Sequence, residues 1–233
     1  MRQIVSAALG LWLCFGYSAF AEGKQGVVVE LYTSQGCSAC PPADDYFATL
    51  VQTPGVIALS LHVDYWDYIG WTDTFANPKF TKRQKGYAHA EGSSMIYTPQ
   101  VIVNGTERVE GNRATKVAKA IGRAQSAVSA VALTVDRQGD TIVIHAQATP
   151  PLRRGARIQL VRYTGSALVQ IERGENAGRS VTYHNIVTSW DDLGEWAGDK
   201  PLNLSAKAAG NAPIVVIIQT EGLSEILAAA QID

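Results

Sequence analysis

The sequence has no excess charge of either sign and few cysteines. Its 20 basic and 21 acidic side chains give a formal charge of −1, and it has 3 cysteines in 233 residues. Without a basic excess, nucleic-acid binding is not expected, and without an acidic tail neither is a purely solvating role. The sequence also lacks a phosphate-binding loop, a dinucleotide fingerprint and a nucleophile elbow. We therefore expect neither a cofactor nor a nucleic-acid partner.

Long apolar runs are missing as well, except at the start of the chain. Residues 1–21 contain Arg2, a mostly apolar stretch from Ile4 to Phe20 and a small-x-small triplet that ends at Ala21. This is the pattern of a secretory signal peptide cleaved after Ala21, and the run is short for the alternative, a retained membrane anchor. We expect a periplasmic or secreted mature chain without a stable membrane span.

The pattern of expected elements changes near residue 127. Strands and helices alternate over residues 22–126, whereas residues 127–233 contain short strands, polar turns and no convincing long helix. We expect an α/β domain over 22–126 and an all-β, sandwich-like domain over 127–233. An apolar fraction of 46% is enough for the cores of two small domains or one large one.

Individual elements follow from the same patterns. In the first half, strands are expected at 26–32, 56–64, 100–103 and 106–111, helices at 43–51 and 113–125, a turn at Asn104-Gly105, and an aromatic-rich, partly helical insertion at 65–96. In the second half, strands are expected at 130–136, 141–148, 156–163, 167–173, 180–187, 201–206 and 213–220. The end of the chain, residues 224–232, fits a strand or a short helix.

Removal of the signal peptide leaves two cysteines, Cys37 and Cys40, each the other's one intramolecular partner. The C-x-x-C pair follows an expected strand and precedes an expected helix, a recognised redox context in a compartment where disulfides persist. A helix N-terminus offers unpaired N–H groups and positive dipole to the first sulfur, which favours thiolate. We expect an exposed nucleophile at Cys37 and a more covered resolving thiol at Cys40.

A second segment strengthens this interpretation. The stretch YTPQVIVNG, residues 97–105, places a proline at the start of a strand that ends in a hairpin turn. With the strand, C-x-x-C helix, strand and helix before it, this order resembles the thioredoxin fold over residues 26–125. The resemblance implies a cis Thr98–Pro99 bond beside the cysteines, with the backbone of Thr98 free to pair with an extended substrate.

Glu30 interrupts a strand that is expected to be buried, and a buried acid needs a partner or a function. Thioredoxins carry an acid in this strand that handles the proton of the resolving cysteine. The resemblance assigns that role to Glu30 if the loop before Cys37 is one residue longer. The alternative is a structural ion pair with Lys79, Lys82 or Arg83.

Several features depart from ordinary thioredoxins. Gly36 rather than tryptophan precedes Cys37, the prolines follow the pair instead of separating it, and Asp44 and Asp45 oppose thiolate formation. The segments HVDYWD, KRQKGYA, YTPQVIVNG and RGENAGR closely resemble a bacterial family of exported proteins classed as domain of unknown function 1223. That resemblance covers nearly the whole mature chain. It implies a thioredoxin-like half followed by a β half and brings no substrate.

Three further groups have both a functional and a structural interpretation. The aromatic side chains of residues 65–80 form either a lid over the cysteines or packing between the insertion and the β half. The turn at 173–179 either captures an anion or, more simply, is a structured turn held by Asn176. His62 or His89 with the two cysteines would make a soft-metal site, although a histidine near a strand end is more often structural.

The favoured function is an exported thiol–disulfide oxidoreductase that acts on protein thiols or disulfides or on a redox partner protein. One alternative is a non-catalytic, thioredoxin-like binding module with a permanent disulfide. A weaker alternative is a copper- or zinc-binding protein that uses Cys37, Cys40 and His62. The candidate catalytic residues are Cys37, Cys40, Thr98, Pro99 and Glu30.

Overall fold

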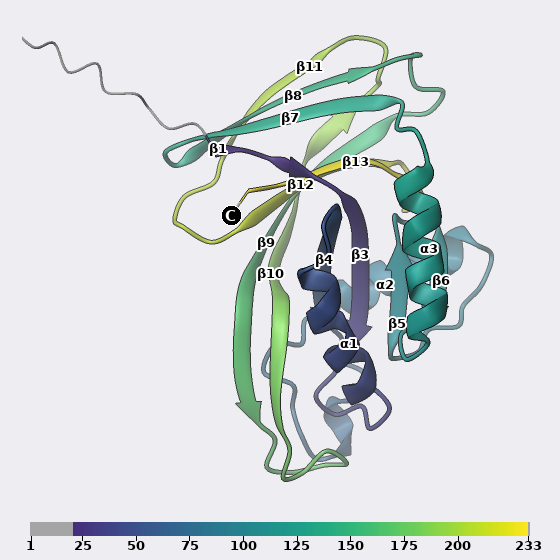
Figure 1. Ribbon diagram of the computed structural model, residues 1–233, viewed down its shortest axis with the longest axis vertical. Helices are drawn as coiled ribbons and strands as arrows, with labels where there is room; N and C mark the ends of the chain where they lie inside the picture. Colours follow the sequence, from purple (N-terminus) through teal and green to yellow (C-terminus); the bar gives the residue numbers. More distant parts are fainter. Residues whose placement is uncertain (1–20, 233) are drawn as a thin grey trace, which may run out of the picture.

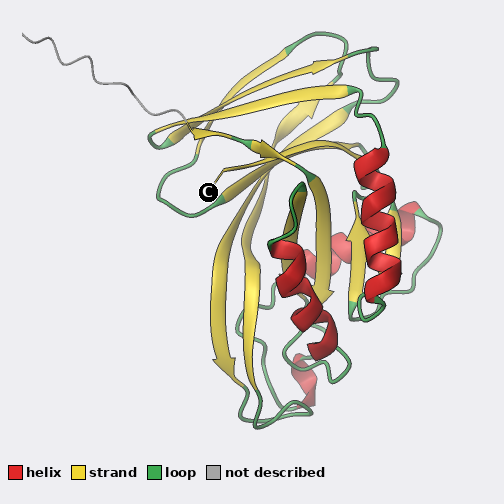
Figure 2. Cartoon of the chain, viewed as in Figure 1, coloured by secondary structure: helices red, strands yellow, loops and turns green. Residues whose placement is uncertain are grey.

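The computed structural model describes residues 21–232 (Figures 1 and 2). Of the predicted signal peptide only Ala21 belongs to this range, and the rest lies outside the described residues. Within residues 21–232, the strands form a curled mixed sheet of nine strands and a small antiparallel sheet of four. In the same range, no helix is long and apolar enough to cross a membrane. The fold is mixed α/β.

The first half contains the elements that its sequence predicts and one short strand, β2 (Lys24–Gln25), that it does not. In chain order these are β2 (Lys24–Gln25), β3 (Val27–Thr33), α1 (Pro41–Val51), β4 (Val56–His62), the 3-10 turn η1 (Asp67–Ile69), α2 (Pro78–Ala90), β5 (Gln100–Val103), β6 (Glu107–Glu110) and α3 (Ala114–Ser126). The predicted insertion holds η1 and α2. Asn104 and Gly105 have φ of 48° and 74°, so the predicted hairpin turn has the two positive φ angles of a type I′ turn.

The central strand β3 separates two faces of the large sheet. It pairs in parallel with β4 and antiparallel with β5, and successive side chains point to opposite faces. Val29 and Leu31 share a core with α1 and α3, whereas Val28 and Tyr32 share a core with α2. The cysteines at the start of α1 and the carboxyl of Glu30 therefore belong to different faces.

The second half is built of strands, as its sequence predicts. These are β7 (Val131–Gln138), β8 (Thr141–Ala148), β9 (Ala156–Gln170), β10 (Ser180–Trp196), β11 (Leu202–Lys207), β12 (Ile214–Thr220) and β13 (Ile226–Ile232), and β1 (Ala21–Glu22) pairs with β7. The separate strands predicted at 156–163 and 167–173 are one strand, because β9 pairs with β10 along its whole length, across Gly165. The segment at the end of the chain is a strand.

The β half is not a sandwich standing apart from the first half. β7, β8, β11 and β1 form the small sheet, whereas β9, β10, β12 and β13 continue the large sheet, since β10 pairs in parallel with β4 at Ile186 and Ser60. The small sheet packs on this extension through a core that includes Leu133 and Ile158. Sandwich-like packing is thus present, but the large sheet crosses residue 126, and the predicted domain boundary there stays a prediction.

The β9–β10 hairpin runs along the long axis of the molecule (Figure 1). Its tip lies at the same end of the molecule as the carboxyl end of β3 and the start of α1. A loop of the second half, residues 171–179, is therefore brought to the segment that carries the two cysteines.

A candidate redox site at the start of α1

Cys37 and Cys40 form a disulfide with an S–S distance of 2.12 Å and a Cα–Cα distance of 5.4 Å. The pair lies between the end of β3 and α1, as its sequence context predicts. Cys40 is the N-cap of α1, and prolines occupy the first two helical positions. The sulfurs are therefore held where a strand ends and a helix begins.

The start of α1 does not offer the free N–H groups that the sequence predicts. Pro41 and Pro42 have no backbone N–H. The next two amides, of Ala43 and Asp44, donate to the carbonyl oxygen of Cys40 at 2.8 and 3.1 Å. Within the first turn of α1, the helix dipole is therefore left to stabilise a thiolate without a free N–H group.

The predicted exposure of the nucleophile is also wrong. The side chains of both cysteines are buried, with 1% of Cys37 and none of Cys40 exposed, whereas Ser38 and Ala39 between them are exposed. Solvent thus reaches the turn between the cysteines but not the sulfur atoms.

The Thr98–Pro99 bond is cis, as the resemblance predicts. The carbonyl oxygen of Pro99 accepts from the N–H of Gly111 at 2.8 Å. A Cβ at Gly111 would lie 2.9 Å from Cβ of Pro99 and 3.3 Å from Cβ of Ala43. The proline therefore packs close to the first turn of α1, and the absence of a side chain at Gly111 permits this approach.

The aromatic insertion contacts the cysteine loop and the second half at once. Nε1 of Trp66 donates to Oγ1 of Thr98 at 2.7 Å, and Nε1 of Trp71 donates to Oε1 of Gln35 at 2.8 Å. Trp71 also packs on a buried cluster from the tip of the hairpin, which includes Ile171. The insertion thus packs against the β half, and a lid over the cysteines stays a prediction.

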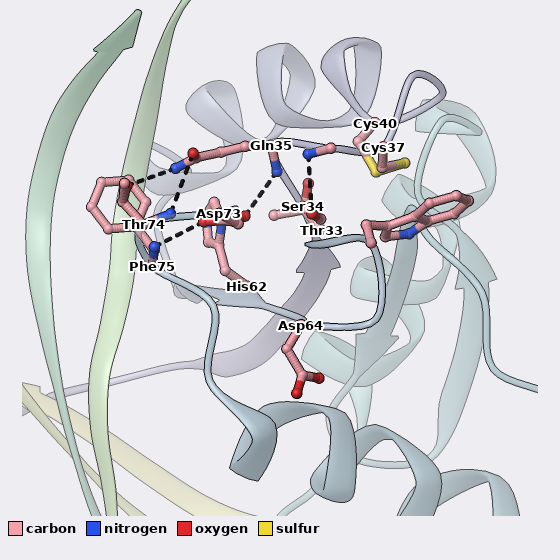
Figure 3. A network of polar contacts seen from close by, with 12 residues as sticks. Thr33, Ser34, Gln35, Cys37, Cys40, His62, Asp64, Asp73, Thr74 and Phe75 are labelled. Carbon is pink, nitrogen blue, oxygen red and sulfur yellow. Dashed lines mark hydrogen bonds and ion pairs between the residues drawn. A yellow bond between two sulfur atoms is a disulfide. The ribbon is translucent and has the colours of Figure 1, made fainter. Parts of the chain in front are cut away.

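His62, at the end of β4, is fully buried. Its Nδ1 is 2.7 Å from Oδ2 of Asp73, and its ring meets the edges of Phe75 and Tyr183. Oδ2 of Asp73 also accepts from the N–H of Gln35 at 2.8 Å (Figure 3). In the part of the chain that the structure describes, no three His, Cys, Asp or Glu side chains are grouped to hold a metal ion. His62 and Asp73 thus brace the loop before the cysteine pair.

Glu30 is fully buried on the α2 face and is held by an ion pair. Its two oxygens accept from Nε and Nη2 of Arg83 at 2.7 and 2.9 Å, and from the hydroxyls of Tyr32 and Tyr87 at 2.8 and 2.6 Å. This is the structural alternative given by the sequence, with Arg83 as the cation. It accounts for the burial of Glu30, and a proton role at Cys40 stays a prediction.

A second buried acid, Asp44, lies on the cysteine face. Its Oδ1 accepts from Oγ1 of Thr33 at 2.8 Å, while Oδ2 is buried without a partner among the described residues. Burial raises the pKa of the Asp44 carboxyl well above its ordinary value, although the Thr33 hydrogen bond opposes the shift. The sequence predicts only that the charge of Asp44 opposes thiolate formation at Cys37. The burial of Asp44 comes from β10, which packs against α1 and places Tyr183 nearby.

Asn176, in the loop between β9 and β10, reaches the cysteine segment from the other half of the chain. Its Nδ2 donates to the carbonyl oxygens of Gln35 and Cys37, each at 2.9 Å. The sequence predicts that Asn176 holds its own turn, and nothing local indicates that it binds residues about 140 positions away. Only the length of the β9–β10 hairpin makes this contact possible.

Comparisons with known proteins give a family but no activity. Among solved structures, the chain is similar to the crystal structure of protein AGR_C_4864 from Agrobacterium tumefaciens, with 30% identity and a TM-score of 0.75 over 88% of this chain and 93% of that one. HBP35 of Porphyromonas gingivalis is similar in fold alone, with 13% identity and a TM-score of 0.61 over 90% of this chain and 75% of that one. No curated protein matches significantly. The model described as "Protein of unknown function (DUF1223)" matches residues 28–219, so this chain belongs to the DUF1223 family.

Proposed function

We propose that this protein is an exported thiol–disulfide oxidoreductase with a thioredoxin-like first half. One observation carries the proposal: the Cys37–Cys40 disulfide lies at the start of α1, and the cis Thr98–Pro99 segment packs beside the same helical turn. The strand order β4-β3-β5-β6, with helices on both faces, supports the thioredoxin-like assignment. Export rests on the apolar pattern of residues 1–21.

In each step of the exchange, one S–S bond forms and one S–S bond breaks. A partner thiolate attacks the sulfur of Cys37, the bond to Cys40 breaks, and Cys40 leaves as a thiolate while Cys37 holds a mixed disulfide. In the reverse step, the Cys40 thiolate attacks the Cys37 sulfur, the Cys37–Cys40 bond re-forms and the partner leaves as a thiolate. Partners are protein thiols or disulfides, or a dedicated redox protein.

We infer that Asp44 exchanges a proton with Cys40. Cys40 has helical dihedral angles (φ −80°, ψ −35°), and Asp44 lies four residues later with its N–H on the Cys40 carbonyl. Residues at this spacing on a helix face are neighbours, with Cβ atoms about 5–6 Å apart. A buried carboxyl with a raised pKa can take up the thiol proton as Cys40 attacks and return it as Cys40 leaves. We therefore assign this role to Asp44 in preference to Glu30.

A permanent structural disulfide is the second candidate, because both sulfurs are buried. The reduction potential separates the two functions. A potential below about −300 mV marks a structural bond, and one between about −270 and −120 mV marks an exchanging bond. Since the first turn of α1 has no free N–H to stabilise a thiolate, we expect an exchanging bond at the reducing end, near about −270 mV.

A trapping experiment tests the proposed function directly. Cys40→Ala should accumulate mixed disulfides through Cys37 in exporting bacterial cells, because the resolving thiol is gone. The double variant Cys37→Ala/Cys40→Ala is the matched control and should trap nothing. Adducts would be counted on non-reducing gels and identified by mass spectrometry. If Cys40→Ala captures no partner and the wild type neither reduces nor oxidises model disulfides, the proposed function is wrong.

A further inference from the structure

The loop between β9 and β10 is attached to the cysteine segment by one side chain. From residue 172 to residue 180, all of which the structure describes, Asn176 is the only buried residue, and 2% of it is exposed. Its amide nitrogen donates to two carbonyl oxygens, those of Gln35 and Cys37, at 2.9 Å each. These carbonyls lie at the nucleophilic cysteine and two residues before it.

Cys37 is kept from solvent although it lies beside an exposed turn. Ser38 and Ala39 are exposed, yet only 1% of Cys37 is. A thiolate must approach the sulfur along the line of the S–S bond, so the buried pair cannot react until something moves. The loop that carries Asn176 is exposed at residues 172–175 and 177–180, and its backbone at Gly174 lies close to Trp71 of the insertion.

The attachment is also incomplete. Oδ1 of Asn176 is buried and has no hydrogen-bond partner among the described residues. A buried acceptor without a donor is unfavourable, and water would satisfy it once the loop lifted away. The closed loop is thus stabilised by two hydrogen bonds and opposed by one desolvated carbonyl oxygen, a balance suited to a segment that opens.

We propose that Asn176 is a latch and positioning residue that controls the access of partner thiols to Cys37. Its release frees the carbonyls of Gln35 and Cys37, so that the cysteine loop can move and expose the sulfur to attack; Cys40 then leaves as a thiolate and a mixed disulfide forms on Cys37. This inference rests on the proposed function and deepens it. The second half of the chain thereby regulates chemistry that resides in the first.

The test measures how fast glutathione reduces the disulfide, with thiols trapped by alkylation and counted by mass. Asn176→Ala should react about 5- to 150-fold faster than the wild type, since two hydrogen bonds of about 0.5–1.5 kcal/mol each are lost. Reoxidation should accelerate by the same factor, so the equilibrium constant with glutathione stays unchanged. A shifted equilibrium constant would show that Asn176 stabilises one redox form and is no latch.

Asn185→Ala is the matched control. Asn185 is also a buried asparagine after β9, and its Nδ2 donates to the carbonyl oxygen of Ala58 at 2.9 Å, on β4. It should destabilise the protein without changing the reduction rate. Equal acceleration in the two variants would overturn the latch, because it would mean general loosening.

A variant with a shortened β9–β10 loop is a second test that does not depend on a point substitution at Asn176. The N–H of Ile171 donates to the carbonyl of Arg179 at 2.9 Å, so an Asn-Gly turn in place of residues 172–178 can close the hairpin. This variant should match Asn176→Ala in rate. If both variants react at the wild-type rate, the latch is wrong while the proposed function stands. If glutathione reduces none of the proteins, the proposed function fails first.

Discussion

Glu30 and Asp44 are both buried acids, but the partners of their carboxyl oxygens differ, and so do the roles that these residues can have. Glu30 has a cation and two hydroxyls on its oxygens. Asp44 has one hydroxyl, from Thr33, and an oxygen without a partner among the described residues. Burial favours the protonated form of the Asp44 carboxyl and raises its pKa. The candidate proton acceptor is the less satisfied of the two.

Asp44 should make the stability of the protein depend on pH. Its pKa is raised in the folded state, so the unfolded chain releases this proton first as the pH rises. Stability present below about pH 4, the ordinary pKa of the group, is lost as the pH rises through the folded pKa. Asp44→Asn removes that loss, and each unit of raised pKa is about 1.4 kcal/mol.

Urea unfolding at pH 4 and pH 8 measures the effect. The stability of Asp44→Asn relative to the wild type should increase by on the order of 1–3 kcal/mol between these pH values. Other titrating groups cancel in this difference. The same variant should slow resolution by Cys40. A relative stability that does not change with pH would contradict the burial of a charged Asp44.

At the scale of elements, α2 fastens the two halves of the chain together. Arg83 on α2 contacts Glu30 on β3, Gln159 on β9 and Gln219 on β12, and its guanidinium lies 3.7 Å from the ring centroid of Trp190. One buried cation therefore has partners on strands from both halves. Removal of the Arg83 side chain would leave the Glu30 carboxylate buried without a cation, in addition to removing contacts.

A double-mutant cycle on this pair should show strong coupling. Arg83→Leu should lower the free energy of unfolding by about 3–5 kcal/mol, because Glu30 is left buried without its cation. Glu30→Gln/Arg83→Leu should cost less than Arg83→Leu alone, as no unpaired charge remains. Urea unfolding of the wild type, both single variants and the double variant gives the coupling energy. Additive effects would mean that the pair is not coupled.

At the scale of the whole molecule, one sheet and one shared core join the two halves that the sequence predicts as separate domains. β10 pairs with β4, and the core that contains Leu59 and Phe80 also contains Val161, Val187 and Ile217. Because both halves contribute side chains to this core, unfolding of one half would expose the core residues of the other. The two halves are therefore expected to unfold together.

Residues 22–233 should unfold in urea as a single transition. Far-ultraviolet circular dichroism reports the strands of both halves, and tryptophan fluorescence weights the insertion and β10, where Trp66, Trp71 and Trp190 lie. The two midpoints should coincide. Separated midpoints would show that the halves are independent domains and that the shared core is weak.

Much of the fold follows from local pattern. The strands at 26–32 and 100–103, the helix after the cysteines and the Asn104-Gly105 turn are each predicted within a few residues, because periodicity and turn chemistry act over short distances. The long β9–β10 hairpin is not predicted. The sequence indicates two separate strands on either side of Gly165, and the pairing with β10 makes them one. Pairing partners, unlike propensities, are not local.

The sequence by itself determined the cysteine pair, its place between strand and helix, and the cis-proline segment expected beside it. Only the tertiary structure decided that both sulfurs are buried, that Arg83 rather than the cysteines accounts for Glu30, and that Asn176 holds the cysteine loop. The reason is physical. Candidate reactive residues can be recognised in the sequence by their type and spacing. Their burial and hydrogen bonds depend on which distant strands pack against them. In this protein those strands belong to the other half of the chain.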